Sequence, residues 1–257
     1  NPEPSAKARE GWKLVWADEF DYTGVPDPAK WDYEVGYIRN NEAQYYTRAR
    51  KENAWVEGGV LTITGRKEKF PISPGRGDKG RTVADYTAAS LITRGKASWT
   101  YGRIEMRAKL PKGRGVWPAF WTVGTTGGWP RGGEIDIMEY VGKEPHDVHS
   151  SLHYSIGGRH TSTGGFVNVD NPWDDFHVYA MDWNSERMDF FCDQTKYFTF
   201  NLSKADDKGT NPYRKPQYLL LNLALGGGYG GPIDDSNLPQ KFVIDYVRVY
   251  QRAEAKK

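Results

Sequence analysis

The sequence predicts an all-β protein, a sandwich of two packed antiparallel sheets, one of them curved to form a cleft. Three observations support this prediction. Short runs of strand-forming residues recur along the chain at intervals typical of a sandwich. Strands do not alternate with helices, and only residues 203–208 suggest a helical turn. The 257 residues are 38% hydrophobic and 14% aromatic, which suits one large core.

We expect a single domain at residues 11–252. Residues 1–10 are polar and contain proline, which is typical of a tether, and residues 253–257 form a lysine-containing tail. Residues 1–10 have neither an initiator Met nor an apolar run. We therefore expect no signal peptide and no membrane span in this chain.

The first half of the chain predicts several strands. Residues 12–20 alternate apolar side chains before an acidic turn, and residues 53–64 indicate a hairpin with its turn at Gly58-Gly59. Residues 65–85 are basic and rich in Pro and Gly, so we expect a long surface loop there. Further strands are predicted at residues 87–94, 97–100 and 102–110. The last should be half-exposed, because charged and apolar residues alternate in it.

The second half of the chain completes the sandwich. The predicted strands are residues 149–154, 173–182, 187–191, 196–201, 217–224 and 242–250. Residues 226–231 are almost all glycine and predict a flexible loop. A phosphate-binding loop is excluded because no helical pattern follows.

Composition excludes several classes of function. The formal charge of +2 comes from scattered charges of both signs, so no basic stripe for nucleic acid is present and a neutral substrate fits. Histidine and cysteine residues show no zinc spacing, so we expect no catalytic metal or other catalytic cofactor. The single cysteine, Cys192, excludes an internal disulfide. We interpret it as a buried small hydrophobe, with a reactive thiol as the alternative.

Residues 133–140, Gly-Glu-Ile-Asp-Ile-Met-Glu-Tyr, predict a strand with three carboxylates on one face. The two isoleucines alternate with Glu134 and Asp136, so they can face a core while the acids face away from it. Glu139 has the wrong parity, unless one extra residue, most simply Met138, is absorbed in a β-bulge. Three like charges on one strand face are unfavourable without a role. The alternative is a solvated strand edge.

Such a row of acids suits glycoside hydrolysis. With the bulge, the backbones of Glu134 and Glu139 are roughly 13 Å apart. Their side chains can lean together to about 5 Å, the separation at which one carboxylate acts as nucleophile and the other as acid/base in a retaining enzyme. Asp136 can hydrogen-bond to one of them and help to separate their pKa values.

The run from Glu134 to Glu139 resembles the active-site signature of family 16 glycoside hydrolases in its bulged E-x-D-x-x-E form. The resemblance extends over residues 12–251. It implies a β-jelly roll with a substrate cleft on the concave face, with Glu134 as nucleophile, Asp136 as its assisting carboxylate and Glu139 as acid/base.

Two further segments carry the resemblance. Residues 40–47, Asn-Asn-Glu-Ala-Gln-Tyr-Tyr-Thr, resemble the Asn-x-Glu-x-Gln-Tyr-Tyr-Thr segment of the laminarinase and mixed-linkage β-glucanase branch. By this resemblance Asn41 contacts glucose on the non-reducing side of the cut, although a polar turn is the alternative. The Trp-Pro-Ala-Phe-Trp run puts Trp117 and Trp121 on one strand face, where indoles can stack on sugars or fill a core. Trp129 is a candidate for a further cleft wall.

The remaining site predictions concern single residues. His149 and His153 share a strand face, and the resemblance favours His153 as the histidine that tunes the acid/base, with a structural histidine as the alternative. Arg94 can reach the cleft or form a surface ion pair. In many family members a structural Ca²⁺ lies away from the cleft, near the positions of Glu19, Gly58 and Asp245.

We therefore predict a monomeric endo-β-glucanase, secreted, periplasmic or tethered to the cell surface, that cuts laminarin or mixed-linkage β-1,3-1,4-glucan with retention of configuration. The alternatives are an endo-hydrolase of another polysaccharide, such as an agar-type galactan, and a non-catalytic carbohydrate-binding sandwich. The amide and tyrosine segment, and the lack of a dense basic patch for sulfate, argue against the galactan.

Overall fold

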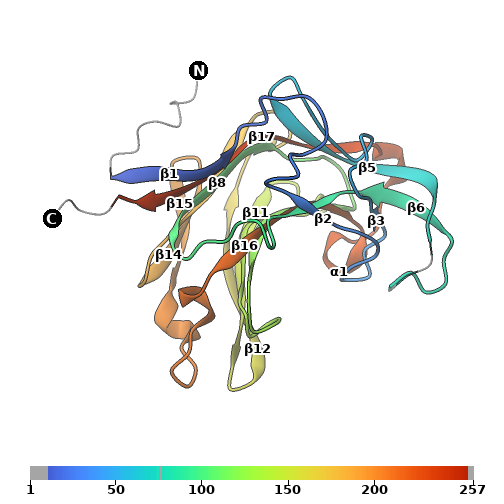
Figure 1. Ribbon diagram of the computed structural model, residues 1–257. Helices are drawn as coiled ribbons and strands as arrows, with labels where there is room; N and C mark the ends of the chain where they lie inside the picture. Colours follow the sequence, from blue (N-terminus) through green and yellow to red (C-terminus); the bar gives the residue numbers. More distant parts are fainter. Residues whose placement is uncertain (1–10, 74, 76, 254–257) are drawn as a thin grey trace.

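The computed structural model describes residues 11–73, 75 and 77–253, which form two stacked sheets of ten and seven strands (Figure 1). Within this described part, the paired strands are antiparallel except β3 with β6. The predicted jelly-roll sandwich is confirmed. The predicted tether, residues 1–10, and residues 254–257 of the predicted tail lie outside the described residues.

Neighbouring strands in each sheet are often distant in sequence. The larger sheet has the order β15 (Thr195–Asn201), β14 (Arg187–Cys192), β13 (His177–Trp183), β8 (Gly102–Lys109), β17 (Gln240–Arg252), β5 (Val60–Pro71), β6 (Val83–Ala88) and β3 (Tyr45–Tyr46), with β1 (Trp12–Asp18) on β17 and β4 (Ala54–Glu57) on β5. The smaller sheet has the order β12 (Arg159–Asn168), β11 (Asp147–Ile156), β10 (Glu134–Tyr140), β9 (Val116–Gly124), β16 (Gln217–Leu225), β7 (Ser90–Ile92) and β2 (Asp32–Glu34). The short helices are η1 (Leu202–Ala205), η2 (Pro212–Arg214), α1 (Gly227–Gly230) and η3 (Asp235–Asn237).

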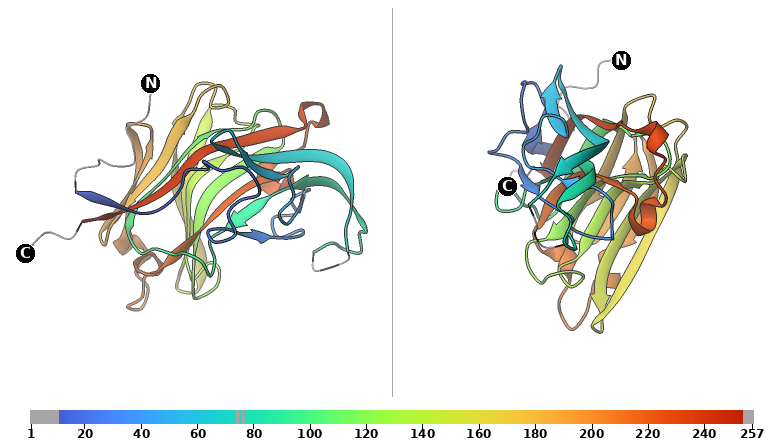
Figure 2. Two further views of the ribbon diagram at one scale, coloured as in Figure 1. Left: turned by 45° about the horizontal axis from the view of Figure 1, so that its top comes forward. Right: turned by 90° about the vertical axis from the view of Figure 1, so that its right-hand side faces the viewer.

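The hydrophobic core lies between the two sheets, whose layers Figure 2 shows from two further directions. Strand β16 illustrates why. Its residues Leu219, Leu221 and Leu223 are fully buried in the main core, whereas Leu220 and Asn222 face the other side of the sheet. Because side chains alternate along a strand, one apolar face leaves the opposite face free for other chemistry.

Several predicted elements are confirmed with modest changes in their ends. The hairpin at residues 53–64 turns at Gly58-Gly59, since Glu57 pairs with Val60. Cys192 is buried, as predicted, and burial raises the pKa of its thiol to about 12. None of the helices in the described part of the chain has the length and apolar character needed to cross a membrane.

The prediction of a long loop at residues 65–85 is wrong. Strand β5 continues to Pro71 and β6 begins at Val83, so the two strands form an arm at the right of Figure 1. Lys67 and Lys69 are exposed and alternate with partly buried neighbours. Pairing with β6 supplies partners for the backbone N–H and C=O groups of β5. The arm needs no apolar stripe, because neither of its faces is buried in the core.

Residues 87–102 also differ from the prediction. Residues 87–94 supply two strands, β6 and β7, which belong to different sheets. Residues 97–100 form no strand, and only Trp99 makes a bridge, to Gln217. Strand β12 was not predicted, because its Thr, Ser and Gly residues bury little apolar surface.

Strand β8 was predicted to be half-exposed. Its charged residues Arg107 and Lys109 are partly exposed, but Arg103 and Glu105 are buried. Arg103 donates to Glu105 at 2.7 Å and to Asp182 at 2.8 Å, and the side chains of Arg103 and Glu105 are 4% and 2% exposed. The predicted alternation of charged and apolar side chains is present in β8. The charged face of β8 is nevertheless covered at Arg103 and Glu105, because opposite charges within the sheet neutralise each other.

We predict that Arg103→Met lowers the free energy of unfolding by roughly 3–5 kcal/mol, because it takes the guanidinium away from a buried carboxylate. Urea denaturation measures the change. The matched control is Arg214→Met, whose partner Asp206 is 3.1 Å away and exposed. That variant should change the free energy by about 1 kcal/mol or less. Equal losses in the two variants would contradict the assignment of Arg103 as a buried ion-pair centre.

Candidate active site

A β-bulge in β10 turns three carboxylates to one face of the smaller sheet. Against β9, Asp136 pairs with Trp121 and Met138 with Phe120, so Ile137 has no partner. The bulge is where the sequence predicted it, but the extra residue on this side is Ile137 rather than Met138. Both are fully buried, and Glu139 regains the parity of Glu134 and Asp136.

Each of the three acidic residues belongs to a row of cross-strand partners that runs across the sheet. The three rows are Phe166, His149, Glu139, Ala119, Asn222, Ser90 and Glu34; then Gly164, Ser151, Asp136, Trp121 and Leu220; then Ser162, His153, Glu134, Val123 and Tyr218. The acids are near the middle of a polar and aromatic surface that runs across the strands.

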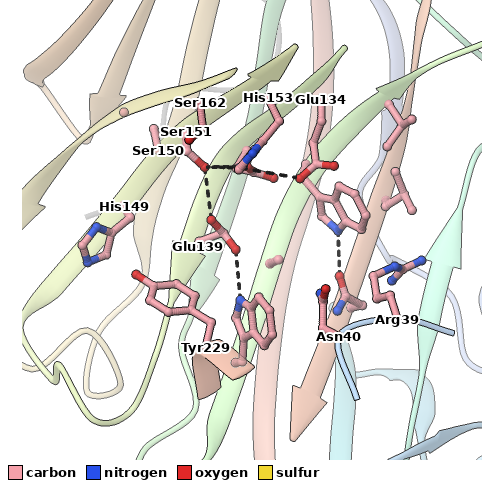
Figure 3. Close-up of a pocket in the computed structure, with 18 of the residues that line it drawn as sticks. Arg39, Asn40, Glu134, Glu139, His149, Ser150, Ser151, His153, Ser162 and Tyr229 are labelled. Atoms are coloured by element: carbon pink, nitrogen blue, oxygen red, sulfur yellow. Dashed lines mark hydrogen bonds and ion pairs between the residues drawn. The ribbon is translucent and has the colours of Figure 1, made fainter. Parts of the chain in front are cut away.

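These rows form the floor of a cleft of about 870 Å³. Figure 3 shows the two glutamates between His149 on one side and Arg39 and Asn40 on the other. A small apolar cluster of Ala119, Trp121 and Leu220 lies beneath the cleft. A cleft that crosses the sheet can hold an extended chain with the carboxylates near its centre.

Glu134 is held by an indole and by its neighbour on the strand. Trp129 Nε1 donates to Glu134 Oε2 at 2.7 Å, and Asp136 and Glu134 share a hydrogen bond. Burial, and then the charge of Asp136, raises the pKa of Glu134 to about 8. The prediction that Asp136 hydrogen-bonds to one of the glutamates is confirmed.

Glu139 is held by Trp117 and Ser151. Trp117 Nε1 donates to Glu139 Oε1 at 3.0 Å, and Ser151 Oγ lies 3.2 Å from Glu139 Oε2 and 2.5 Å from Asp136 Oδ2. Burial raises the pKa of both Glu139 and Asp136, since ionising either one places charge in a poorly solvated site. The hydrogen bonds from Trp117 and Ser151 act in the opposite direction, because they stabilise the ionised form of Glu139.

Each of the two glutamates has a histidine as its cross-strand partner on β11. His153 is the cross-strand partner of Glu134, and its Nε2 lies 3.4 Å from Asp136 Oδ2 and 4.0 Å from Glu134 Oε1. The cross-strand partner of Glu139 is instead His149. His153 was predicted beside the acid/base, and its closest carboxylate contacts are with Asp136 and Glu134.

The three predicted tryptophans all line the cleft. Trp117 makes an edge contact with Tyr229, with ring centroids 5.4 Å apart. Trp129 is 57% exposed and forms a wall of the cleft. Trp121 is 9% exposed, so most of its ring is covered by protein.

Two predicted contacts lie outside the cleft lining. Asn41 is exposed and accepts a hydrogen bond from Lys79 at 3.5 Å, while its neighbour Asn40 lines the cleft. Both asparagines have positive φ, so the backbone turns between them and separates their side chains. Arg94 is exposed above the ring of Tyr218, at 5.9 Å.

Sequence reasoning missed several lining residues. They are Glu34, Arg39, Asn40, Glu42, Ser151, His160, Phe166, Tyr218, Asn222 and Tyr229. Asn40 and Glu42 lie in the segment singled out for its amides, and Ser151 lies between the two noted histidines. The others come from strands or loops whose local pattern carries no sign of the cleft.

Three groups in the described part of the chain bring three possible metal ligands within 4.8 Å of one another. One is Glu134, Asp136 and His153, whose contacts are described above. None of the three groups includes Glu19 or Asp245. Glu19 instead accepts two hydrogen bonds from Arg248, each of 2.8 Å, and Asp245 accepts one from Arg107 at 2.6 Å.

Comparison with known proteins gives consistent matches. Residues 41–248 match the profile of glycosyl hydrolases family 16. A β-glucanase of Rhodothermus marinus is 47% identical, over 95% of this chain and 86% of that protein.

Solved structures agree with this match. A laminarinase from Rhodothermus marinus superposes with a TM-score of 0.83 at 46% identity, covering 95% of this chain and 98% of that one. A structure from work on endo-acting O-glycanases, which human gut bacteria express to initiate mucin breakdown, superposes with a TM-score of 0.90 at 38% identity, covering 98% and 95%. With its bulged row of carboxylates and these matches, the chain belongs to family 16 of the glycosyl hydrolases.

Proposed function

We propose that this chain is a retaining endo-β-glucanase that hydrolyses internal bonds of β-1,3-glucan or mixed-linkage β-1,3-1,4-glucan. The observation that carries the proposal is the row of Asp136, which is buried, and Glu134 and Glu139, which are half-buried, all hydrogen-bonded on the floor of a cleft that crosses the sheet. A carbohydrate-binding sandwich without activity would gain nothing from placing three carboxyl groups in a poorly solvated site, where each costs stability when it ionises. The names of the relatives support glucan as the polymer.

The geometry supports a two-step reaction. Glu134 attacks the anomeric carbon while Glu139 gives its proton to the glycosidic oxygen, so that the bond to the leaving sugar breaks and a glycosyl-enzyme forms. Glu139 then removes a proton from water, which attacks the same carbon and releases Glu134. Asp136 and Trp129 orient Glu134, whereas Trp117 and Ser151 orient Glu139.

A second substrate class has support from one comparison. The O-glycanase structure superposes more closely than the laminarinase does, although the laminarinase is closer in sequence. A mucin O-glycan is therefore the alternative substrate. The glucan is preferred because of the higher identity and because residues 40–47 resemble the glucanase segment.

We also propose export and a monomeric state. Polymeric glucan is degraded outside the cytoplasm, so secretion, a periplasmic location or attachment to the cell surface follows from the proposed substrate. A monomer suffices for the reaction, because every residue of the proposed mechanism comes from one chain.

The calcium ion implied by the resemblance is a further proposal. The predicted ligands lie on or beside paired strands of the larger sheet, since Asp18 pairs with Val247, Ile244 with Leu61, and Glu57 with Val60. Oxygen donors of this kind suit calcium. The carboxylates of Glu19 and Asp245 are already paired with arginines, so the side chains do not fit an ion as they stand. Binding through these side chains requires Glu19 to exchange Arg248, and Asp245 to exchange Arg107, for the ion.

The first prediction ranks substrates. Laminarin and mixed-linkage glucan should be hydrolysed far faster than agarose, xylan or mucin O-glycans, because the cleft resembles that of glucanases. Release of reducing sugar from this panel measures the ranking. If agarose or mucin O-glycans are hydrolysed faster than glucan, that polysaccharide is the substrate instead. Inactivity on every polysaccharide of the panel would favour a non-catalytic binding protein.

The second prediction separates the roles of the two glutamates. On a β-glycoside with an activated leaving group, Glu139→Ala should still form the glycosyl-enzyme, which azide then attacks to give a β-glycosyl azide. In Glu134→Ala, azide fills the cavity and attacks the intact substrate, giving the α-azide. NMR of the products identifies the anomer. The reverse pair of products would exchange the roles, and inversion by the unmodified enzyme would exclude retention.

The third prediction concerns calcium. Millimolar calcium should raise the melting temperature relative to a chelator, because an ion that binds only the folded state adds about 2.7 kcal/mol at a concentration of 100 times Kd. Differential scanning calorimetry measures the shift, and kcat well below the melting temperature should not change. Identical melting temperatures in calcium and chelator would dismiss the site, and loss of activity in a chelator without unfolding would argue against the metal-free mechanism.

A further inference from the structure

His153, Asp136 and Glu134 lie together on the floor of the cleft and offer one nitrogen and two oxygen ligands (Figure 3). His153 Nε2 lies 3.4 Å from Asp136 Oδ2 and 4.0 Å from Glu134 Oε1. Two ligand atoms that are each about 2.1 Å from a tetrahedral zinc ion are roughly 3.4 Å apart. The nitrogen and the Asp136 oxygen therefore already have the separation of two zinc ligands, and a small rotation of the Glu134 carboxylate brings its oxygen to the same separation.

The hydrogen bonds around these three side chains leave the ligand atoms available. Trp129 Nε1 donates to Oε2 of Glu134, and not to the oxygen nearest His153. Ser151 Oγ donates to Asp136 Oδ2 at 2.5 Å, and a carboxylate oxygen has a second lone pair with which to bind an ion. All three ligands line the cleft, so an ion can enter from solvent.

His160 provides the outer contact that a metal-bound histidine needs. His153 Nδ1 lies 2.9 Å from His160 Nε2, and the two rings are stacked with their centroids 5.2 Å apart. In the tautomer in which Nδ1 donates to His160, the lone pair of His153 is on Nε2 and faces the carboxylates. Histidines that bind metal ions generally donate their other ring N–H to an acceptor in this way. The pair of histidines therefore suits a metal ligand with its orienting partner.

The charges at this point of the cleft favour a cation. Asp136 and Glu134 share a hydrogen bond, so they are close enough for one ion to contact both, and the charge of Asp136 acts on Glu134. A divalent ion in place of the shared hydrogen, which leaves as a proton, offsets the repulsion between the two carboxylates. The side chain of Asp136 is only 4% exposed, so water screens the attraction weakly.

Two other groups of possible ligands in the described part of the chain suit an ion less well. They are His177, Cys192 and Asp193, and Glu144, Asp147 and His149. In the first group an ion has to break the hydrogen bond of 2.8 Å from His177 Nδ1 to Asp193 and remove the proton of a buried thiol. In the second group the side chain of Glu144 is 40% exposed, so water screens the charges that would hold an ion.

We propose that His153 Nε2, Asp136 Oδ2 and Glu134 Oε1 form a zinc-binding site, and that bound Zn²⁺ reversibly inhibits the enzyme. Water completes the tetrahedral coordination. Imidazole together with carboxylates suits Zn²⁺, whereas Ca²⁺ and Mg²⁺ prefer oxygen ligands alone. Because Trp129 already donates to the other oxygen of Glu134, a zinc-bound Glu134 has no free oxygen with which to attack a sugar. Zinc binding is independent of the proposed glucanase function, whereas inhibition rests on the role of Glu134 as nucleophile.

The first test measures zinc binding directly. Zinc chloride is titrated into the enzyme in a calorimeter, with millimolar calcium chloride present so that any calcium site is filled. One Zn²⁺ should bind per chain. His160→Phe keeps an aromatic ring against Trp129 but removes the acceptor for His153, so it should weaken zinc binding roughly tenfold to hundredfold. His153→Phe removes a ligand and should weaken binding at least as much.

Matched variants in the other two groups control for the position of the ion. His177→Phe and His149→Phe make the same change in those groups, and both variants should bind zinc with the affinity of the unmodified enzyme. The melting temperature of every variant without zinc shows whether it is folded. If His153→Phe does not fold, His160→Phe still tests the site, because His160 lies at the surface.

The second test measures inhibition on whichever polysaccharide the enzyme hydrolyses. At substrate concentrations well below KM, the zinc concentration that halves the rate should equal the dissociation constant from the titration. In His160→Phe it should rise by the same factor as the dissociation constant, relative to the rate of that variant without zinc. Millimolar Mg²⁺ or Ca²⁺ should not inhibit.

The outcomes separate the zinc site from the proposed function. The absence of zinc binding, or a loss of binding in His177→Phe or His149→Phe with none in His153→Phe and His160→Phe, would overturn the site while leaving the glucanase function in place. Zinc binding without inhibition would overturn the role of the bound ion. If the enzyme hydrolyses no polysaccharide, the proposed function fails, and the titration still decides whether the site exists.

Discussion

The β-bulge at Ile137 and Met138 is the constraint on which the site depends. Without the extra residue, Glu139 would point into the core between the sheets, where an ionised carboxyl group is costly. With it, three carboxyl groups share one face. These groups repel one another when they are ionised. Hydrogen bonds from Trp117, Trp129 and Ser151, and one between Asp136 and Glu134, stabilise them. The pKa values of all three groups are raised first by burial and, for Glu134 and Asp136, also by the charge of a neighbouring carboxylate.

The sandwich makes this crowding possible by keeping its apolar and functional faces separate. In β16 the inward leucines pack in the main core, while Asn222 on the outer face binds Trp121 and Tyr46. The loop carrying Arg39 and Asn40 then closes one half of the cleft. That half holds paired charges and amides beside Trp121 and Tyr218, whereas His149, Phe166 and Tyr229 line the other half. The two halves therefore offer different chemistry to the two parts of a bound chain.

Sequence reasoning succeeded where a local pattern has a single physical reading. The alternation in residues 133–140 predicted both the strand and the need for a bulge, and Gly58-Gly59 predicted its hairpin turn. It failed where pairing partners decide the structure. The basic residues 65–71 form a strand because β6 supplies their hydrogen bonds, and Arg103 and Glu105 are buried because Asp182 on a neighbouring strand shares their charge.

The sequence by itself determined the class of fold and the strand that carries the three carboxylates, because side-chain parity and spacing are local properties of the backbone. Only the tertiary structure decided which residues surround them. The turn between Asn40 and Asn41 directs Asn40 into the cleft, and the register of β10 with β11 places His153 beside Glu134. Arg39 reaches Trp121 from a loop some eighty positions earlier in the chain. Such contacts depend on how the two ends of the sheet come together, and no local pattern encodes that.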